Sequence, residues 1–188
     1  ALKQAAQAED TKRAQSFLKL AVENADIAAQ TGLPLCQDTG MAVVFAQIGQ
    51  DVHITGGLFQ DAVNQGVRRA YADMRKSVLS SLERINTMDN TPAVIHIELI
   101  AGEEIILSAA PKGFGSENMS ALKMLKPSQG VEGVKRFIVE TVKNAGGNPC
   151  PPVVVGVGIG GTMEKAALMA KHALLRPLGT SPSCRQSF

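Results

Sequence analysis

LPLCQDTGMAVVF, residues 33–45, places a cysteine, an amide, a carboxylate and a hydroxyl directly before an apolar run. The apolar spacing of residues 12–30 predicts an amphipathic helix before it, which a glycine and a proline then end. The apolar run itself, residues 41–48, is typical of a buried strand. The polar residues 36–40 are therefore expected in a loop between a helix and a buried strand, where site residues often lie.

The rest of the sequence alternates between helical and extended patterns. Expected helices are residues 12–30, 59–74, 131–145 and 162–175, and expected strands are 41–48, 52–55, 93–100, 105–110 and 153–157. The turn AGEE predicts that residues 93–100 and 105–110 pair as a hairpin, and PKGFGSENMS predicts a loop that enters a helix ending before Pro127. We expect an α+β (mixed α/β) fold, with helices packed on small, mostly antiparallel sheets in a single domain.

The composition excludes several classes of function. The chain has 188 residues, of which 45% are hydrophobic and 19% charged, and its net charge is +2. So small a charge, with one tyrosine and no tryptophan, argues against a nucleic-acid partner. No segment has the roughly 20 apolar residues of a membrane span. Three cysteines do not form a secreted disulfide framework, so we expect a cytoplasmic protein.

Two interpretations of the first cysteine loop are open. In one, Asp38 begins a turn and Cys36 packs as a small hydrophobic residue. In the other, the Cys36 thiolate binds a metal or cluster and Asp38 transfers a proton beside it. Cys150, held between prolines in GGNPCPP, has the same two interpretations. The two cysteines are too far apart in sequence for a local C-x-x-C motif, so only the fold can make them co-ligands.

Three further segments are candidates for ligand binding. Gly156-x-Gly158-x-x-Gly161 has the spacing of a dinucleotide fingerprint, although no acidic residue follows Glu164 to bind the ribose. The alternatives are close backbone packing and anion binding at a helix N-terminus. The glycines of KGFGSENMS expose amides suited to a carboxylate, or form an ordinary capped turn in which Ser116 is the N-cap. An arginine in DMRKSV is suited to bidentate carboxylate binding, or is a solvated helix residue.

Together, PLCQDTGMAVVF, RKSV, KGFGSENMS and NPCPPVVVGVGIGGTMEKAALMAKHALLRPLG resemble one family. It is the α subunit, or N-terminal domain, of iron–sulfur class I fumarate hydratases and related L-tartrate dehydratases, and the resemblance runs from residue 12 to 179. It implies a hydro-lyase that adds water to fumarate to give malate, or dehydrates tartrate. It also implies a [4Fe–4S] cluster held by three cysteines, with one iron free to act as a Lewis acid.

The resemblance assigns roles by position. Cys36 and Cys150 match cluster ligands, and Asp38 matches a proton-transfer residue. The positions that match substrate-binding residues are Gln37, Arg75, Gly115 and Ser116. On this basis the small dicarboxylate is held by an amide and a guanidinium while a carboxyl group beside the iron handles the proton of its hydroxyl.

The C-terminal end departs from the family. The family's third cysteine lies farther downstream, and Cys184 stands in unrelated surroundings, so we expect that it is not the third ligand. Residues 1–180 are expected to form an incomplete α-type domain, and residues 181–188 a divergent tail. The family's general base lies on a β subunit or C-terminal domain, so we expect such a partner and an oligomer. Two alternatives remain: a non-catalytic remnant that only pairs with a β partner, and a nucleotide-binding protein.

Overall fold

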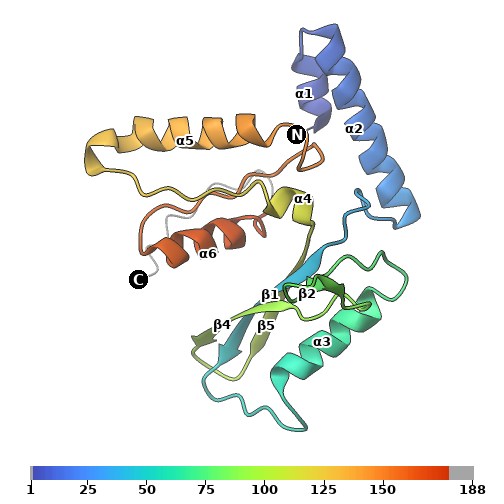
Figure 1. Ribbon diagram of the computed structural model, residues 1–188, viewed down its shortest axis with the longest axis vertical. Coiled ribbons are helices and arrows are strands. Elements are labelled where there is room, and N and C mark those ends of the chain that lie inside the picture. The colour runs from blue at the N-terminus through green and yellow to red at the C-terminus, as the bar shows by residue number, and fades with distance from the viewer. Residues whose placement is uncertain (1, 178–188) are drawn as a thin grey trace. The chain divides into compact units, whose positions relative to one another are not determined.

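The computed structural model describes residues 2–177 and confirms the α+β class (Figure 1). The helices are α1 (Leu2–Ala8), α2 (Lys12–Thr31), α3 (Phe59–Ala70), α4 (Phe114–Glu117), α5 (Gly130–Ala145) and α6 (Met163–Ala173), with a 3-10 turn η1 (Pro127–Gln129). The strands are β1 (Met41–Gly49), β2 (Leu79–Ser80), β3 (Ile85–Asn86), β4 (Val94–Ile100) and β5 (Ile105–Lys112). The chain forms two compact units, one of Ala1–Leu35 with the segment from Val154 onward and one of Cys36–Val153.

The second unit is built on a three-stranded sheet in the order β4-β1-β5. Strand β1 pairs parallel with β4, with Val43 opposite Val94, and antiparallel with β5, with Val43 opposite Ala110. The predicted hairpin between 93–100 and 105–110 is therefore wrong, because β1 lies between the two strands. The reason is that β1 is buried along most of its length, and pairing on both edges satisfies the backbone of a strand that is removed from water.

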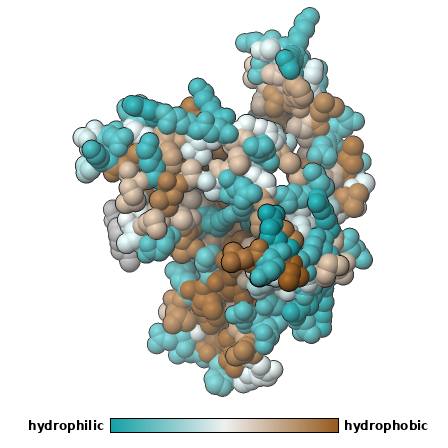
Figure 2. All heavy atoms as spheres, in the orientation of Figure 1, coloured by the Kyte–Doolittle hydropathy of each residue, from teal (hydrophilic) through white to brown (hydrophobic). Residues whose placement is uncertain are grey.

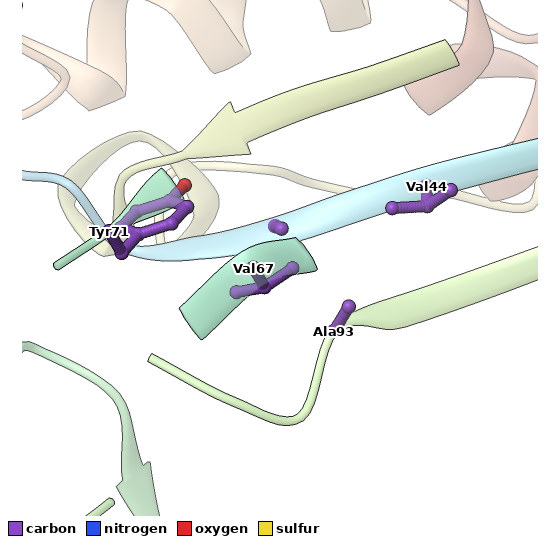
Figure 3. Packing of buried hydrophobic residues seen from close by; sticks show 5 residues of the cluster. Val44, Val67, Tyr71 and Ala93 are labelled. Carbon is purple, nitrogen blue, oxygen red and sulfur yellow. The ribbon is translucent and has the colours of Figure 1, made fainter. Parts of the chain in front are cut away.

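Helix α3 covers one face of this sheet. Ala42 and Val44 of β1 pack against Val67 of α3, Tyr71 just after it and Ala93 just before β4, as Figure 3 shows for four of them. Removing these apolar side chains from water provides the favourable free energy that holds the helix on the sheet. This packing fixes the end of α3, from which the segment leading to Arg75 departs.

The outer strands are less covered. Figure 2 shows hydrophobic atoms gathered over the part of the unit that carries β4 and β5. Large apolar side chains of the two strands are exposed within the described part of the chain: Ile97, Leu99, Ile105, Ile106 and Leu107. This exposure agrees with their place at the two edges of the sheet.

Several predicted elements differ in extent. Residues 52–55 and 153–157 form no strand, and α3 ends at Ala70 rather than at residue 74. The helix expected after PKGFGSENMS is limited to the single turn α4, since Met119 N–H donates to Ser116 O at 3.1 Å and tightens the chain into a turn. The interpretation of Ser116 as an N-cap is also wrong, because Gly113 occupies that position. The short pair β2–β3 and helix α1 were not predicted.

In the first unit, α1 and α2 form a helical hairpin (Figure 1). The predicted apolar face of α2 is confirmed, because its members are each partly buried: Leu18, Ala21, Val22, Ala25 and Ala28. Among the helices of residues 2–177, none has the length and apolar character needed to cross a membrane.

Candidate active site

The loop Cys36–Gly40 precedes β1 and is fixed by hydrogen bonds of Thr39. The Thr39 hydroxyl donates to Arg75 O at 2.6 Å, and the buried Tyr71 hydroxyl donates to Thr39 O at 3.4 Å. Because Tyr71 belongs to the hydrophobic cluster between α3 and the sheet, the loop is anchored to the core of this unit. Loops anchored in this way can hold reactive side chains in a defined geometry.

The structure brings Cys36 and Cys150 together. Both thiols are free, Cys36 is half-buried and Cys150 is exposed, and a hydrogen bond joins the two side chains. The pKa of Cys150 is raised, first because of this hydrogen bond and then because a negative charge on Cys36 opposes a second one beside it. Cys150 also has a φ of +55°, which is uncommon for a residue with a side chain and is typical of functional loops.

Asp38 lies against the glycine loop that begins α4. Gly115 N–H donates to Asp38 Oδ2 at 2.9 Å, and a Cβ added at Gly113 would lie 2.9 Å from Asp38 Cγ. A Cβ at Gly115 would lie 2.9 Å from Asn148 O, so the loop before Cys150 also packs against this glycine. Both positions favour glycine, because the backbone at Gly113 lies too close to the Asp38 carboxylate for a side chain and the backbone at Gly115 lies too close to the Asn148 carbonyl. The Ser116 hydroxyl donates to Gly113 O at 2.9 Å.

Arg75 approaches the same loop through its main chain. Its carbonyl accepts the Thr39 hydroxyl and, at 2.9 Å, the amide of Asn90. Its side chain is exposed, and no ion pair joins its guanidinium to another residue in 2–177. The guanidinium is thus available to an anionic ligand.

The predicted site residues therefore belong to one connected set within the second unit. The cysteines contact each other, Asp38 contacts Gly115, and the Cys36 thiol lies 3.5 Å from Gln37 Oε1. Cys184 lies outside the described residues. Within residues 2–177, no three or more His, Cys, Asp or Glu side chains are grouped so that they could hold a metal ion. The cysteine pair can supply two of the ligands that a metal site needs.

Sequence reasoning missed two residues of this set, Thr39 and Asn90. The sequence around Thr39 predicts only a turn, and Asn90 lies in DNTP, a polar run that is typical of exposed turns. The side chain of Asn90 is instead 0% exposed and accepts Ser77 N–H at 2.8 Å. No pattern in a single sequence distinguishes a buried asparagine of this kind from a solvated one.

The glycines of GVGIGG have a packing role in the first unit. A Cβ at Gly156 would lie 2.1 Å from Ala170 O, and a Cβ at Gly158 would lie 2.1 Å from Ala166 O. The segment therefore lies directly on the backbone of α6, and residues 153–157 do not form the strand that a dinucleotide-binding unit begins with. Of the alternatives weighed for this motif, close packing is the one that these contacts support.

Comparison with known proteins shows to which family the chain belongs. The family described as fumarate hydratase (Fumerase) matches residues 1–186, which extends beyond the stretch 12–179 marked by the motifs. The chain belongs to this family. It is 45% identical over 187 residues to a putative L(+)-tartrate dehydratase subunit alpha of Methanocaldococcus jannaschii, covering 95% of this chain and 66% of that protein. It is 32% identical over 185 residues to the L(+)-tartrate dehydratase subunit alpha of Escherichia coli (strain K12), covering 95% of this chain and 61% of that protein.

The resemblance predicted from the motifs is confirmed at the level of the family. The chain spans less than two thirds of the length of these relatives. The matched stretch contains both the PLCQDTG and the NPCPP cysteines of this chain.

Proposed function

We propose that this chain is the α-subunit portion of a hydro-lyase that adds water to, or removes it from, a small 2-hydroxy-dicarboxylate. The observation that carries the proposal is the convergence of Cys36, Cys150, Asp38 and Gly115, from two loops and the helical turn α4, in a member of this family. Fumarate, malate and tartrate are the candidate substrates. Tartrate has the additional support that the compared relatives are named as tartrate dehydratase α subunits.

Two adjacent free thiols fit two ligands of a [4Fe–4S] cluster. Thiolates are the ligands that iron–sulfur clusters take, and the pKa of Cys150 is raised first by its hydrogen bond with Cys36 and then by the negative charge of that thiolate. When bound, such a cluster would supply a Lewis-acidic iron that polarises the substrate hydroxyl. Cys36 and Cys150 would hold it, together with a third ligand that the described residues do not include.

Asp38 is the residue that we assign to proton transfer. A hydroxyl group leaves more readily as water, so dehydration needs a proton at the hydroxyl oxygen, and hydration returns that proton to the protein. The Gly115 N–H fixes Asp38 Oδ2 at 2.9 Å, which orients the carboxyl group beside the cysteine pair. The absence of side chains at Gly113 and Gly115 leaves the backbone close to this group.

The remaining residues of the set bind the carboxylates. Arg75 is suited to hold one carboxylate through two parallel N–H groups, and Gln37 donates an amide hydrogen to another. Gly115 and Ser116 line the loop beside the reacting carbon. In this proposal a β subunit or C-terminal domain supplies the group that takes the proton from the neighbouring carbon, and the working enzyme is an oligomer of both.

The test is anaerobic iron–sulfur reconstitution of the α chain with its β subunit, followed by assays on fumarate, malate and tartrate. We expect visible cluster absorbance and hydro-lyase activity on at least one of them, and loss of both in Cys36→Ser. The matched control Ser80→Ala changes an exposed side chain in the same unit and should retain both. An intact cluster and full activity in Cys36→Ser would contradict the proposal, and a colourless, stable oligomer without activity would favour a non-catalytic remnant.

A further inference from the structure

The segment that carries Arg75 has no regular secondary structure, yet its main chain is held at successive peptide groups. Arg75 O accepts the Thr39 hydroxyl at 2.6 Å and Asn90 Nδ2 at 2.9 Å. In the next two peptide groups, Ser77 N–H and Val78 N–H both donate to Asn90 Oδ1, at 2.8 and 3.4 Å. A single buried carboxamide therefore replaces the hydrogen-bond ladder that a helix or strand would provide.

The side chain of the neighbouring cation, Lys76, is bound by main-chain carbonyls, unlike that of Arg75. The Lys76 ammonium donates to Tyr71 O, and to Ala72 O at 2.7 Å, so it folds back onto the segment that follows α3. The Lys76 carbonyl accepts Asn86 Nδ2 at 2.9 Å. Of the two adjacent cations, the lysine is thus bound to main-chain carbonyls of its own unit, while the Arg75 side chain is exposed to ligands.

Asn90 is well suited to a fixed structural position. It is 0% exposed, and its φ of +58° is one that asparagine adopts more readily than most residues. Its neighbour Asp89 accepts Thr91 N–H at 3.0 Å, which closes the turn around it. A buried amide without partners is costly, so the Asn90 side chain needs its three hydrogen bonds to the Arg75 segment. The peptide groups of that segment in turn need Asn90 as their hydrogen-bond partner.

We propose that Asn90 and Thr39 are positioning residues for Arg75, and that they set the geometry with which the enzyme binds a substrate carboxylate. This inference rests on the carboxylate-binding role proposed above for Arg75. Thr39 adjoins Asp38 in sequence, so the bond from its hydroxyl to Arg75 O fixes the backbone of the carboxylate-binding residue relative to that of the proton-transfer residue. Displacing a binding group by about 1 Å can reduce catalysis by up to 100-fold.

The test uses the complete α subunit with its β subunit after cluster reconstitution. Thr39→Val removes the hydroxyl and keeps the shape, and Thr39→Ser restores the hydroxyl as the matched control. We expect Thr39→Val and Asn90→Ala to raise KM for the dicarboxylate by about tenfold, with Thr39→Ser close to the wild type. Amide hydrogen exchange of Ser77 and Val78 should be faster in Asn90→Ala, which reports on the segment without using activity.

A double-mutant cycle separates positioning of Arg75 from a general structural effect. In an Arg75→Ala background, Thr39→Val and Asn90→Ala should change KM by less than about twofold, because the group that they position is gone. If the effects of Thr39→Val and Asn90→Ala on KM add fully to that of Arg75→Ala, the positioning inference alone is overturned. The same holds if Arg75→Ala raises KM while Thr39→Val and Asn90→Ala leave it unchanged. An unchanged KM in Arg75→Ala overturns the role of Arg75 and this inference with it. If Asn90→Ala does not fold, Thr39→Val and its serine control decide.

Discussion

At the scale of single residues, position 115 shows how closely the candidate site is packed. A methyl group there would lie 2.9 Å from Asn148 O and 3.4 Å from Asp38 Oδ2. Gly115→Ala must therefore move either the loop before Cys150 or the hydrogen bond to Asp38. We expect kcat/KM of the reconstituted enzyme to fall by about 10- to 100-fold, as small displacements of catalytic groups do.

The matched control for this prediction is Gly66→Ala. Gly66 is exposed on α3, and a Cβ there meets no atom within 4 Å. Alanine favours a helix over glycine by about 1 kcal/mol, so this variant should retain activity and gain stability. Equal activity of the Gly115→Ala and Gly66→Ala enzymes in steady-state assays would contradict the packing argument.

Asp89 gives a pH dependence with a defined sign. Hydrogen bonds from Thr91 and Arg68 lower the pKa of Asp89 from 3.8 to about 2. As the pH falls below about 4, the unfolded chain takes up this proton before the folded chain does. The corresponding stability is therefore present above pH 4 and is lost as the pH falls towards 2. Urea unfolding between pH 2 and 5 should show a smaller pH dependence in Asp89→Asn.

The control for Asp89 is Asp51→Asn, which changes an exposed carboxylate by the same charge. We expect the pH dependence of its unfolding free energy to remain close to that of the wild type. If Asp89→Asn and Asp51→Asn give the same slope, the turn around Asn90 is not held by the Asp89 carboxylate.

The residues of the site divide into those that sequence could and could not predict. Cys36, Asp38 and Cys150 were candidates from their positions in loops, and their proximity in the structure is what the spacing alone could not provide. Asn90 could not be predicted, since its importance depends on burial and on three bonds to a distant segment. Tertiary contacts of this kind leave no local signature.

At the scale of elements, strand β1 explains the main error of prediction. The extended patterns on either side of the AGEE turn correctly indicated two strands at β4 and β5, but their pairing depended on a third strand far earlier in the chain. The nearly continuous apolar run of β1 was the available signal, because a strand buried on both faces usually lies inside a sheet. Local turn chemistry predicted the strands and long-range burial decided their order.

The close packing of GVGIGG on α6 leads to a prediction for the first unit. In Gly158→Ala the new methyl would lie 2.1 Å from Ala166 O, so the segment must separate from the helix. We expect the unfolding free energy to fall by about 1–3 kcal/mol in urea titrations. Val157→Ala, at an exposed neighbouring position, should change it far less.

The same segment distinguishes packing from nucleotide binding. If the glycines serve only close packing, calorimetric titration of the wild type with NAD should release no heat of binding. Saturable NAD binding that Gly158→Ala abolishes would instead restore the dinucleotide interpretation.

At the scale of the whole molecule, the cysteines lead to a prediction about cluster loading. The described part of the chain brings together two thiols, Cys36 and Cys150, whereas a cluster with one free iron needs three ligands. The resemblance to the family predicts that Cys184, which lies outside the described residues, is not the third ligand. We therefore expect anaerobic reconstitution of the 188-residue chain alone to give less than one cluster per chain.

Iron content and visible absorbance of three serine variants of this chain measure the contribution of each thiol. Cys36→Ser and Cys150→Ser should lose most of the iron that the wild type retains, because each removes one of the two thiolates that are adjacent in the described part of the chain. Cys184→Ser should match the wild type. A full cluster per chain that Cys184→Ser abolishes would make Cys184 the third ligand, and the 188 residues would then hold the cluster without any further segment.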